Sequence, residues 1–328
     1  MPAQHKIESP QRLHLIGYAA LCLIWGSTWL AIRVVVRSVP PLEAAAIRFL
    51  LAAVLLLVIA LVQKRPWPQH HHEWDALIVL GFTIMAVPYG LLFWAEQYVS
   101  SSMTAVLFSS MPLFVALMTP LMSHARVPRQ AVFSMMVAFG GLLVLFYSGL
   151  GTGARALLGG IAILVAVILS AWSVIYAKRR LHGVDAVVST GLQLAFGAIA
   201  LLWGTWALES RRHATWSTSA MMALVFLVVF GSCAAFVIYY WLLKRMQPYQ
   251  LSSISLIVPV IALFEGALLG HEAVGLTNLI AVFIILGSVA TVLRARSEPG
   301  RTGGRVLNIE NNDIEHNNSE PIDIGGRS

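Results

Sequence analysis

Two charged residues, Arg48 and Glu265, lie inside long apolar segments of this 328-residue sequence. In a bilayer a charge costs at least ~2.5–3.5 kcal/mol near the centre, so such residues usually face a cavity or pair with each other. Arg48 is suited to bind a substrate carboxylate, because its planar guanidinium offers two parallel hydrogen bonds. Glu265 could pair with Arg48 or with an amine, and could exchange a proton. The alternative is that both side chains snorkel to the membrane surface.

Aromatic, hydroxyl and proline residues in the apolar segments form a second group of candidates. Aromatic and hydroxyl groups offer amphipathic contacts to an organic molecule. A mid-helix proline removes a backbone hydrogen bond, and such breaks tend to line transport cavities. The candidate substrate-binding residues are Trp25, Ser27, Arg48, Tyr89, Pro112, Trp172, Ser173, Tyr176, Tyr240, Pro259 and Glu265. Packing within the core, or a kink satisfied by neighbours such as Ser109 or Ser255, is the alternative reading.

Enzyme and metal chemistry find little support in the residue pattern. His70–Glu73 is the one metal-like cluster, but consecutive histidines point in different directions on a helix and no second cluster completes a site. We therefore expect a solvated loop there and no bound metal. The sequence contains no Gly-x-Ser-x-Gly, His-Glu-x-x-His or P-loop pattern, so we expect neither hydrolysis nor ATP as a driving force. No cofactor is expected.

The composition places these residues in a membrane protein. Hydrophobic residues make up 58% of the chain, charged residues 11%, and the mean hydropathy is +0.77. A soluble domain carries about 25% charged residues, so too few charges remain to cover a soluble surface. The apolar runs do not alternate with polar residues, which favours helices over a barrel. Cys22 and Cys233 lie in apolar runs and suggest no disulfide.

Ten apolar segments are long enough to cross a bilayer as helices, which needs roughly 20 residues each. They cover approximately residues 13–35, 42–62, 74–95, 103–122, 131–147, 157–177, 186–208, 216–243, 251–269 and 276–293. We predict an all-α membrane protein with about ten transmembrane helices. The expected organisation is 1–12 as a cytoplasmic N-terminal segment, 13–148 as the first five-helix repeat, 149–156 as a linker, 157–293 as the second repeat and 294–328 as a disordered cytoplasmic tail.

The distribution of Lys and Arg predicts the orientation. With the N-terminus inside, the cytoplasmic ends and loops carry 13 Lys and Arg and the opposite side carries 5. This bias favours cytoplasmic N- and C-termini, in agreement with an even number of helices. It also explains the formal charge of +7 without a nucleic-acid partner.

The two halves of the chain coincide when one is shifted by 147 residues. The matches at this offset join uncommon residue types across five segments: Trp25 with Trp172, Phe49 with Phe196, Trp94 with Trp241, Pro112 with Pro259, His124 with His271 and Gly140 with Gly287. Each half holds five predicted helices, and an odd number forces the halves into opposite orientations. This is the inverted-repeat design of many secondary transporters.

Several short motifs support a family resemblance that covers about residues 13–293. They are Trp25-Gly26-Ser27-Thr28 in the first segment, Pro40-Pro41 followed by Ala46-Ile47-Arg48-Phe49 in the second, the central prolines of the fourth and ninth, and His271-Glu272. In order, spacing and duplication they resemble the EamA-type branch of the drug/metabolite transporter superfamily. The resemblance implies ten helices in two inverted repeats, and export of amino acids or related metabolites.

We therefore expect a multi-pass transporter of the bacterial inner membrane that works by alternating access on a small organic molecule. Its expected partners are that substrate and membrane lipid, with a homodimer left open. A carrier of drugs or sugar derivatives is the alternative within transport. A membrane-embedded enzyme or sensor, with Arg48, Glu265 and the histidines acting catalytically, is the alternative from another class.

Overall fold

The computed structural model describes residues 8–99, 101–123, 125–145, 153–209, 213–270 and 276–295. These residues form helices and connecting turns, with no strand among them. In chain order the helices of the first half are α1 (Glu8–Val36), α2 (Pro41–Val62), α3 (His71–Leu80), the π-helical segment η1 (Gly81–Ala86), α4 (Val87–Ala95), α5 (Ser101–Phe108), α6 (Met111–Ser123) and α7 (Arg129–Leu145). Those of the second half are α8 (Ala154–Arg180), α9 (Ala186–Gly204), η3 (Thr205–Glu209), α10 (Thr218–Phe226), η4 (Leu227–Ala234), α11 (Ala235–Leu243), α12 (Pro248–Ser252), α13 (Ile254–Gly270) and α14 (Leu276–Arg294).

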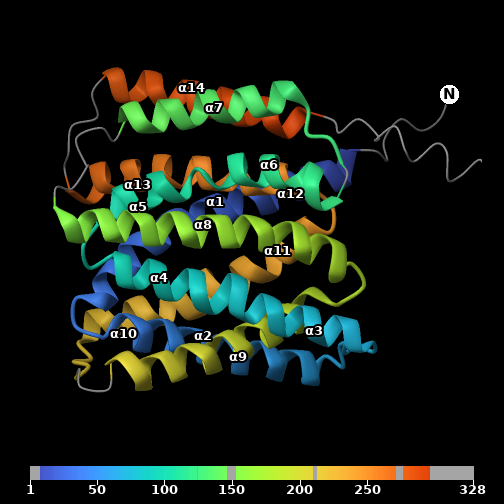
Figure 1. Cartoon of the computed structure of the whole chain (residues 1–328), viewed down its shortest axis with the longest axis vertical. Coiled ribbons are helices and arrows are strands. Elements are labelled where there is room, and N and C mark those ends of the chain that lie inside the picture. The colour runs from blue at the N-terminus through green and yellow to red at the C-terminus, as the bar shows by residue number, and fades with distance from the viewer. Residues whose placement is uncertain are drawn as a thin grey trace, which may run out of the picture.

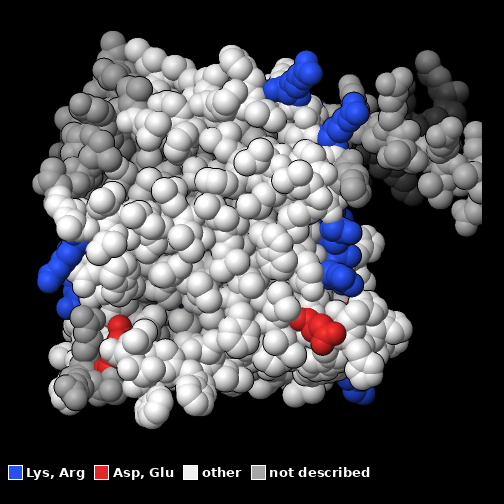
Figure 2. All heavy atoms as spheres, in the orientation of Figure 1, with Lys and Arg blue, Asp and Glu red and all other residues white. Residues whose placement is uncertain are grey.

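The lengths and apolar character of the helices fit a membrane protein. Within the described residues, 7 helical stretches are long and apolar enough to cross a bilayer, and shorter apolar helices cover Arg129–Leu143, Pro248–Ile261 and Leu279–Arg294. Each of the apolar segments predicted from the sequence is mostly helical in its described part, with short breaks in the fourth and ninth segments. Figure 2 shows the charged side chains gathered toward the two ends of the helices, with a wide uncharged band between them. The prediction of an α-helical membrane protein is confirmed.

The helices run roughly alongside one another and pair between the two halves (Figure 1). The closest pairs are α2 with α9 and α7 with α14. Glycines allow the α9 backbone to approach η1, since a Cβ at Gly197 would lie 2.5 Å from the Cβ of Met85. Around the centre, α1 packs on α13 and α6 packs on α8. Elements distant in sequence therefore share one interior.

Two of the long helices contain a π-helical segment that frees a carbonyl group. In η1 the N–H of Val87 donates to the Phe82 carbonyl, five residues back, so the Thr83 carbonyl loses its α-helical partner. In η4 the N–H of Ala235 donates to the Phe230 and Ser232 carbonyls and bypasses Gly231 in the same way. Such bulges are frequent at functional sites. Both freed carbonyls accept side-chain hydrogen bonds, described below.

The helix breaks predicted at Pro112 and Pro259 are placed differently by the structure. In the fourth apolar segment the break falls at Ser109–Ser110, and Pro112 is the second residue of α6, where its missing N–H costs little. In the ninth segment Ser253 separates α12 from α13, and Pro259 lies within α13. Ser109 Oγ donates to the Ser255 carbonyl at 2.5 Å, which is the group that Pro259 cannot bond. Ser109 thus bonds the carbonyl that Pro259 leaves without its helical partner, and the role of the two prolines in substrate binding stays a prediction.

Two other boundaries differ from the sequence prediction. Helix α8 begins at Ala154, within the stretch 149–156 that was expected as a linker, after Gly153, whose φ of 115° suits glycine. The histidine cluster expected in a loop begins a helix, since His70 precedes α3 and His71 opens it. Glu73 accepts hydrogen bonds from the backbone N–H groups of Gln69 and His70 at 2.8 and 3.1 Å. The cluster thus caps a helix.

Candidate functional site

A cavity of about 900 Å³, its open part included, lies among helices of both halves. Its walls are mostly apolar and come from α1, α2, η1, α4, α5, α6, α8, α11, α12 and α13: Trp25, Thr28, Trp29, Ile32, Arg48, Ile84, Pro88, Tyr89, Leu92, Ala105, Phe108, Met111, Ser170, Phe236, Tyr239, Leu251, Ser252, Ile254, Ser255 and Val258. One charged side chain stands among these residues.

That charged side chain is Arg48, which is 1% exposed. Its Nε donates to Ser232 Oγ at 2.8 Å, and its Nη2 donates to the Gly231 carbonyl freed by η4 at 3.1 Å. The guanidinium carbon lies 5.3 Å from the ring centre of Phe49 and 5.4 Å from that of Tyr89. No carboxylate of the described residues pairs with it, and Nη1 has no hydrogen-bond partner. The described residues therefore orient this cation without neutralising it.

Aromatic rings continue from Arg48 along the cavity wall. Tyr89 contacts Phe236 with ring centres 6.1 Å apart, and Phe236 contacts Trp25 at 5.7 Å. Trp25 in turn contacts Tyr239 at 5.3 Å. These edge-to-face and tilted contacts are the geometries that aromatic pairs prefer. They form a firm apolar surface that begins at the cation.

Three more polar groups on this wall are buried without a hydrogen-bond partner: Nε1 of Trp25, Nε1 of Trp29 and the hydroxyl of Tyr239. Trp29 is 9% exposed and Tyr239 4%. An unsatisfied buried donor costs about 1–3 kcal/mol, so several on one cavity wall call for a physical reason. Hydrogen bonding to a ligand in the cavity would be such a reason.

Comparison with known proteins assigns the chain to a family. The sequence profile of the EamA-like transporter family matches residues 13–147 and again residues 157–294. This chain belongs to the EamA-like transporter family. It is a membrane transporter of the drug/metabolite type, as the resemblance of its motifs predicted.

Relatives of this EamA-like transporter agree with that assignment. The uncharacterised inner membrane transporter YedA of Escherichia coli (strain K12) is 31% identical, over 86% of this chain and 91% of the relative. The uncharacterised transporter YoaV of Bacillus subtilis is 27% identical, over 83% and 93%. A solved crystal structure at 21% identity covers 86% of this chain and 97% of its own with a TM-score of 0.71, which supports the fold.

The sequence candidates of this EamA-like transporter divide between the cavity and its surroundings. Trp25, Arg48 and Tyr89 line the cavity. Ser27 donates to the Leu23 carbonyl of its own helix at 3.0 Å. Pro112 and Pro259 are outside the described lining, although Met111 and Val258 beside them belong to it.

The second-half candidates occupy packing positions. Ser173 donates from α8 to the freed Thr83 carbonyl at 3.1 Å and lies 2.8 Å from Thr83 Oγ1. Trp172 and Tyr176 stack on each other with ring centres 4.8 Å apart. Tyr240 donates to Gln193 Oε1 at 2.5 Å. None of these four belongs to the described lining of the cavity.

Glu265 lies in α13, and its side chain falls outside the part of the chain that the structure describes. The predicted pairing of Glu265 with Arg48 therefore stays a prediction. No group of three or more potential metal ligands occurs among the described residues.

Sequence reasoning missed lining residues that stand next to its candidates: Thr28, Trp29, Ser170, Phe236 and Tyr239. A spacing signal was available for two pairs. Trp29 follows Trp25 by four residues and Tyr239 follows Phe236 by three, so each pair shares one face of a helix. The aromatic faces, more than single residues matched across the repeat, mark the cavity.

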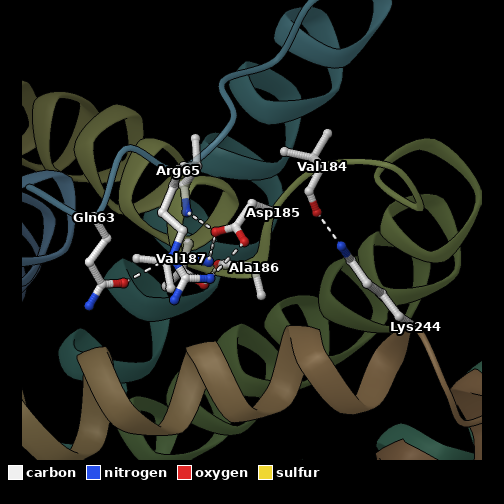
Figure 3. A network of polar contacts seen from close by, with 9 residues as sticks. Gln63, Arg65, Val184, Asp185, Ala186, Val187 and Lys244 are labelled. Carbon is white, nitrogen blue, oxygen red and sulfur yellow. Dashed lines mark hydrogen bonds and ion pairs between the residues drawn. The ribbon is translucent and has the colours of Figure 1, made fainter. Parts of the chain in front are cut away.

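A second polar region lies at one end of the helices, between the connections after α2 and α8 (Figure 3). Arg65 Nη1 pairs with Asp185 Oδ2 at 3.1 Å. Asp185 Oδ1 also caps α9 by accepting from the backbone N–H groups of Val187 and Val188 at 2.9 and 3.2 Å. These contacts join a connection of the first half to the start of α9.

Lys244, directly after α11, completes this end of the molecule by donating to the Val184 carbonyl. Partial burial lowers the pKa of the Lys244 ammonium, and the nearby Asp185 carboxylate acts in the opposite direction. The cationic and acidic groups shown in Figure 3 all have protein partners.

Proposed function

We propose that this EamA-like transporter exports a small amphipathic organic acid, an amino acid or a related compound, by alternating access. The substrate carboxylate binds Arg48, and its apolar body lies against Tyr89, Phe236 and Trp25. The observation that carries this proposal is the unneutralised guanidinium of Arg48 on the wall of an apolar cavity. A charge that lacks a counter-ion among the described residues in such a place is explained by a ligand that supplies one.

The contacts of Arg48 make it a suitable anchor for a carboxylate. Ser232 and the Gly231 carbonyl hold Nε and Nη2, which fixes the plane of the guanidinium. Nη1 remains for the substrate, and donors fixed in advance lose less entropy on binding. Gly231 permits this approach, because a Cβ there would lie 3.2 Å from Nη2 and 2.9 Å from Thr28 Cγ2.

We further propose that the chain consists of two inverted five-helix repeats whose relative movement opens the cavity to either side. The pairing of α2 with α9 and of α7 with α14 supports this arrangement, since each pair joins equivalent segments of the halves. So does the spacing of η1 and η4, which overlap when shifted by the 147 residues that relate the sequences. Inverted repeats around a central site are a common basis of alternating access.

Transport in proteoliposomes tests the proposed function. Purified full-length protein should carry a labelled phenyl-substituted carboxylic acid and should ignore its methyl ester, which keeps the shape and loses the charge. Arg48→Lys should reduce this transport about 10–100-fold, the cost of replacing a charge-assisted fork by a point charge. Arg65→Lys is the matched control, since Arg65 follows the same helix and is paired with Asp185. Equal transport by the Arg48→Lys and Arg65→Lys variants would contradict the proposal.

The proposed orientation, with both termini in the cytoplasm, has a separate test. Alkaline phosphatase is active when it reaches the periplasm. A phosphatase fused after Ser297 should therefore be inactive in a bacterial host, whereas one fused in the connection after Val36 should be active. An active fusion after Ser297 contradicts this topology.

A further inference from the structure

The unpaired hydrogen-bond donors on the cavity wall indicate which groups the substrate carries at the end that does not bind Arg48. Arg48 accounts for one end, and the aromatic wall leads from it to Trp25 and Tyr239. At that end the indole N–H of Trp25 and the hydroxyl of Tyr239 lack partners, and so does the indole N–H of Trp29, one turn nearer to Arg48 along α1. An indole N–H can donate and cannot accept. The described part of this wall thus offers donors in two places.

We propose that the substrate is an organic acid with a second hydrogen-bond acceptor, an oxo or carboxylate oxygen, placed beyond its apolar body where Trp25 and Tyr239 donate. This inference rests on the proposed function and narrows its substrate class. It disfavours a free ammonium at that end, because an ammonium carries only donors and would face indole N–H groups.

The geometry of α1 supports a ligand that extends between these two places. Trp25 and Trp29 are four residues apart, so they stand one above the other on the same face, about 6 Å apart along the helix axis. Thr28 lies beside Gly231 and hence beside the guanidinium, since a Cβ at Gly231 would contact both. The two indoles therefore lie along the cavity wall between Arg48 and Tyr239. A substrate whose apolar body contains one ring would extend over this distance.

Binding of three matched compounds tests the proposal on the full-length protein in nanodiscs. The compounds share a phenylpropionate skeleton: 3-(4-carboxyphenyl)propionate ends in an acceptor, 3-phenylpropionate ends in hydrogen, and 3-[4-(aminomethyl)phenyl]propionate ends in an ammonium. Affinity is measured by isothermal titration calorimetry. The acceptor compound should bind about tenfold more tightly than 3-phenylpropionate, the effect of one good hydrogen bond. The ammonium compound should bind more weakly than both.

Variants assign the preference to the indoles. The Trp25→Phe, Trp29→Phe double variant keeps two aromatic rings and removes both N–H groups. The ratio of its affinities for the acceptor compound and for 3-phenylpropionate should therefore fall from about ten to about one. Trp206→Phe is the matched control, because Trp206 is 70% exposed, contacts Trp203 and is outside the described cavity lining.

The outcomes separate this inference from the proposed function. Equal affinity for the three compounds, tighter binding of the ammonium compound, absence of binding, or a preference that survives the double variant would each overturn the inference. Binding in the expected order without movement across proteoliposomes would overturn the proposed transport and leave the inference standing. Transport of 3-phenylpropionate, with equal affinity for all three compounds, would overturn the inference and leave the proposed transport standing.

Discussion

In the π-helical segments η1 and η4 a freed backbone carbonyl accepts a side-chain hydrogen bond, but the two donors differ. In η1 the freed Thr83 carbonyl accepts from Ser173, and the hydroxyl of Ser173 also lies 2.8 Å from Thr83 Oγ1 and from the Leu169 carbonyl. In η4 the freed Gly231 carbonyl accepts from Arg48. Ser173 has no donor left over, whereas Arg48 retains Nη1. The first contact uses the whole donor capacity of its side chain, and the second leaves Nη1 for the ligand that we propose.

This difference separates packing from function within one architecture. Both bulges expose a carbonyl that must find a donor, because an unsatisfied buried group is costly. A small hydroxyl meets that need and nothing more. A guanidinium meets it and brings a charge that the described residues do not neutralise. At the 147-residue offset Arg48 corresponds to Ala195, so the other half keeps its fold with no charge at this position.

Removing the two side chains should therefore affect different properties, and the largest effect is expected at Arg48. Arg48→Ala should abolish binding of the carboxylic acid within the range of the measurement, since anchor and charge are both lost. Ser173→Ala should leave binding per folded molecule unchanged and lower the free energy of unfolding by about 1 kcal/mol, the value of one hydrogen bond. Titration calorimetry and thermal unfolding of both variants measure the two effects. Unchanged binding in Arg48→Ala would remove the contrast.

Adding a methyl group to the glycine of each bulge should sharpen the same contrast. A Cβ at Gly81 would lie 2.5 Å from the Phe196 Cβ and 3.2 Å from the Gln193 carbonyl. Gly81→Ala should thus separate η1 from α9 and destabilise the protein by about 1–3 kcal/mol, as overpacking does. Gly231→Ala pushes on Arg48 and Thr28, so it should weaken acid binding more than it lowers the melting temperature. The ratio of the two effects in each variant is the measurement.

Substitutions in the polar region near Asp185 should change the stability of the protein and leave its affinity for the acid unchanged. Asp185→Ala removes the N-cap of α9 and the ion pair with Arg65, and should cost about 1 kcal/mol, typical of a lost cap. Arg65→Ala removes only a partly exposed ion pair, for which about 0–1 kcal/mol is usual. Neither change should alter the affinity for the acid. A loss of affinity in either variant would extend the functional site to this end.

Lys244 should give the smallest effect, visible in the pH dependence of stability. Burial lowers its pKa in the folded protein, so the folded state binds fewer protons than the unfolded state above that pKa. The penalty for charging Lys244 is present at neutral pH and is relieved as the pH rises toward the unfolded pKa of about 10.4. The melting temperature of the natural protein, relative to that of the Lys244→Met variant, should therefore rise between neutral pH and pH 10. A constant difference would contradict this reading.

The sequence by itself determined the helical membrane fold and marked Arg48. Apolar segments of sufficient length must form helices in lipid, because their backbone groups have no other partners there. The charge of Arg48 in such a segment is costly wherever it lies, so its type and position were enough to make it a candidate. Trp25 and Tyr89 were also predicted, as aromatic residues of the same segments.

Only the tertiary structure decided which face of each helix meets the cavity. Thr28 and Tyr239 belong to its described lining, while the adjacent residues Ser27 and Tyr240 do not. Successive helical residues point about 100° apart, and a segment that is apolar all round gives no signal of its rotation. The π-helical segments were equally hidden, since they arise from contacts between helices distant in sequence. Those contacts, which no local pattern records, hold the guanidinium of Arg48 at the cavity wall.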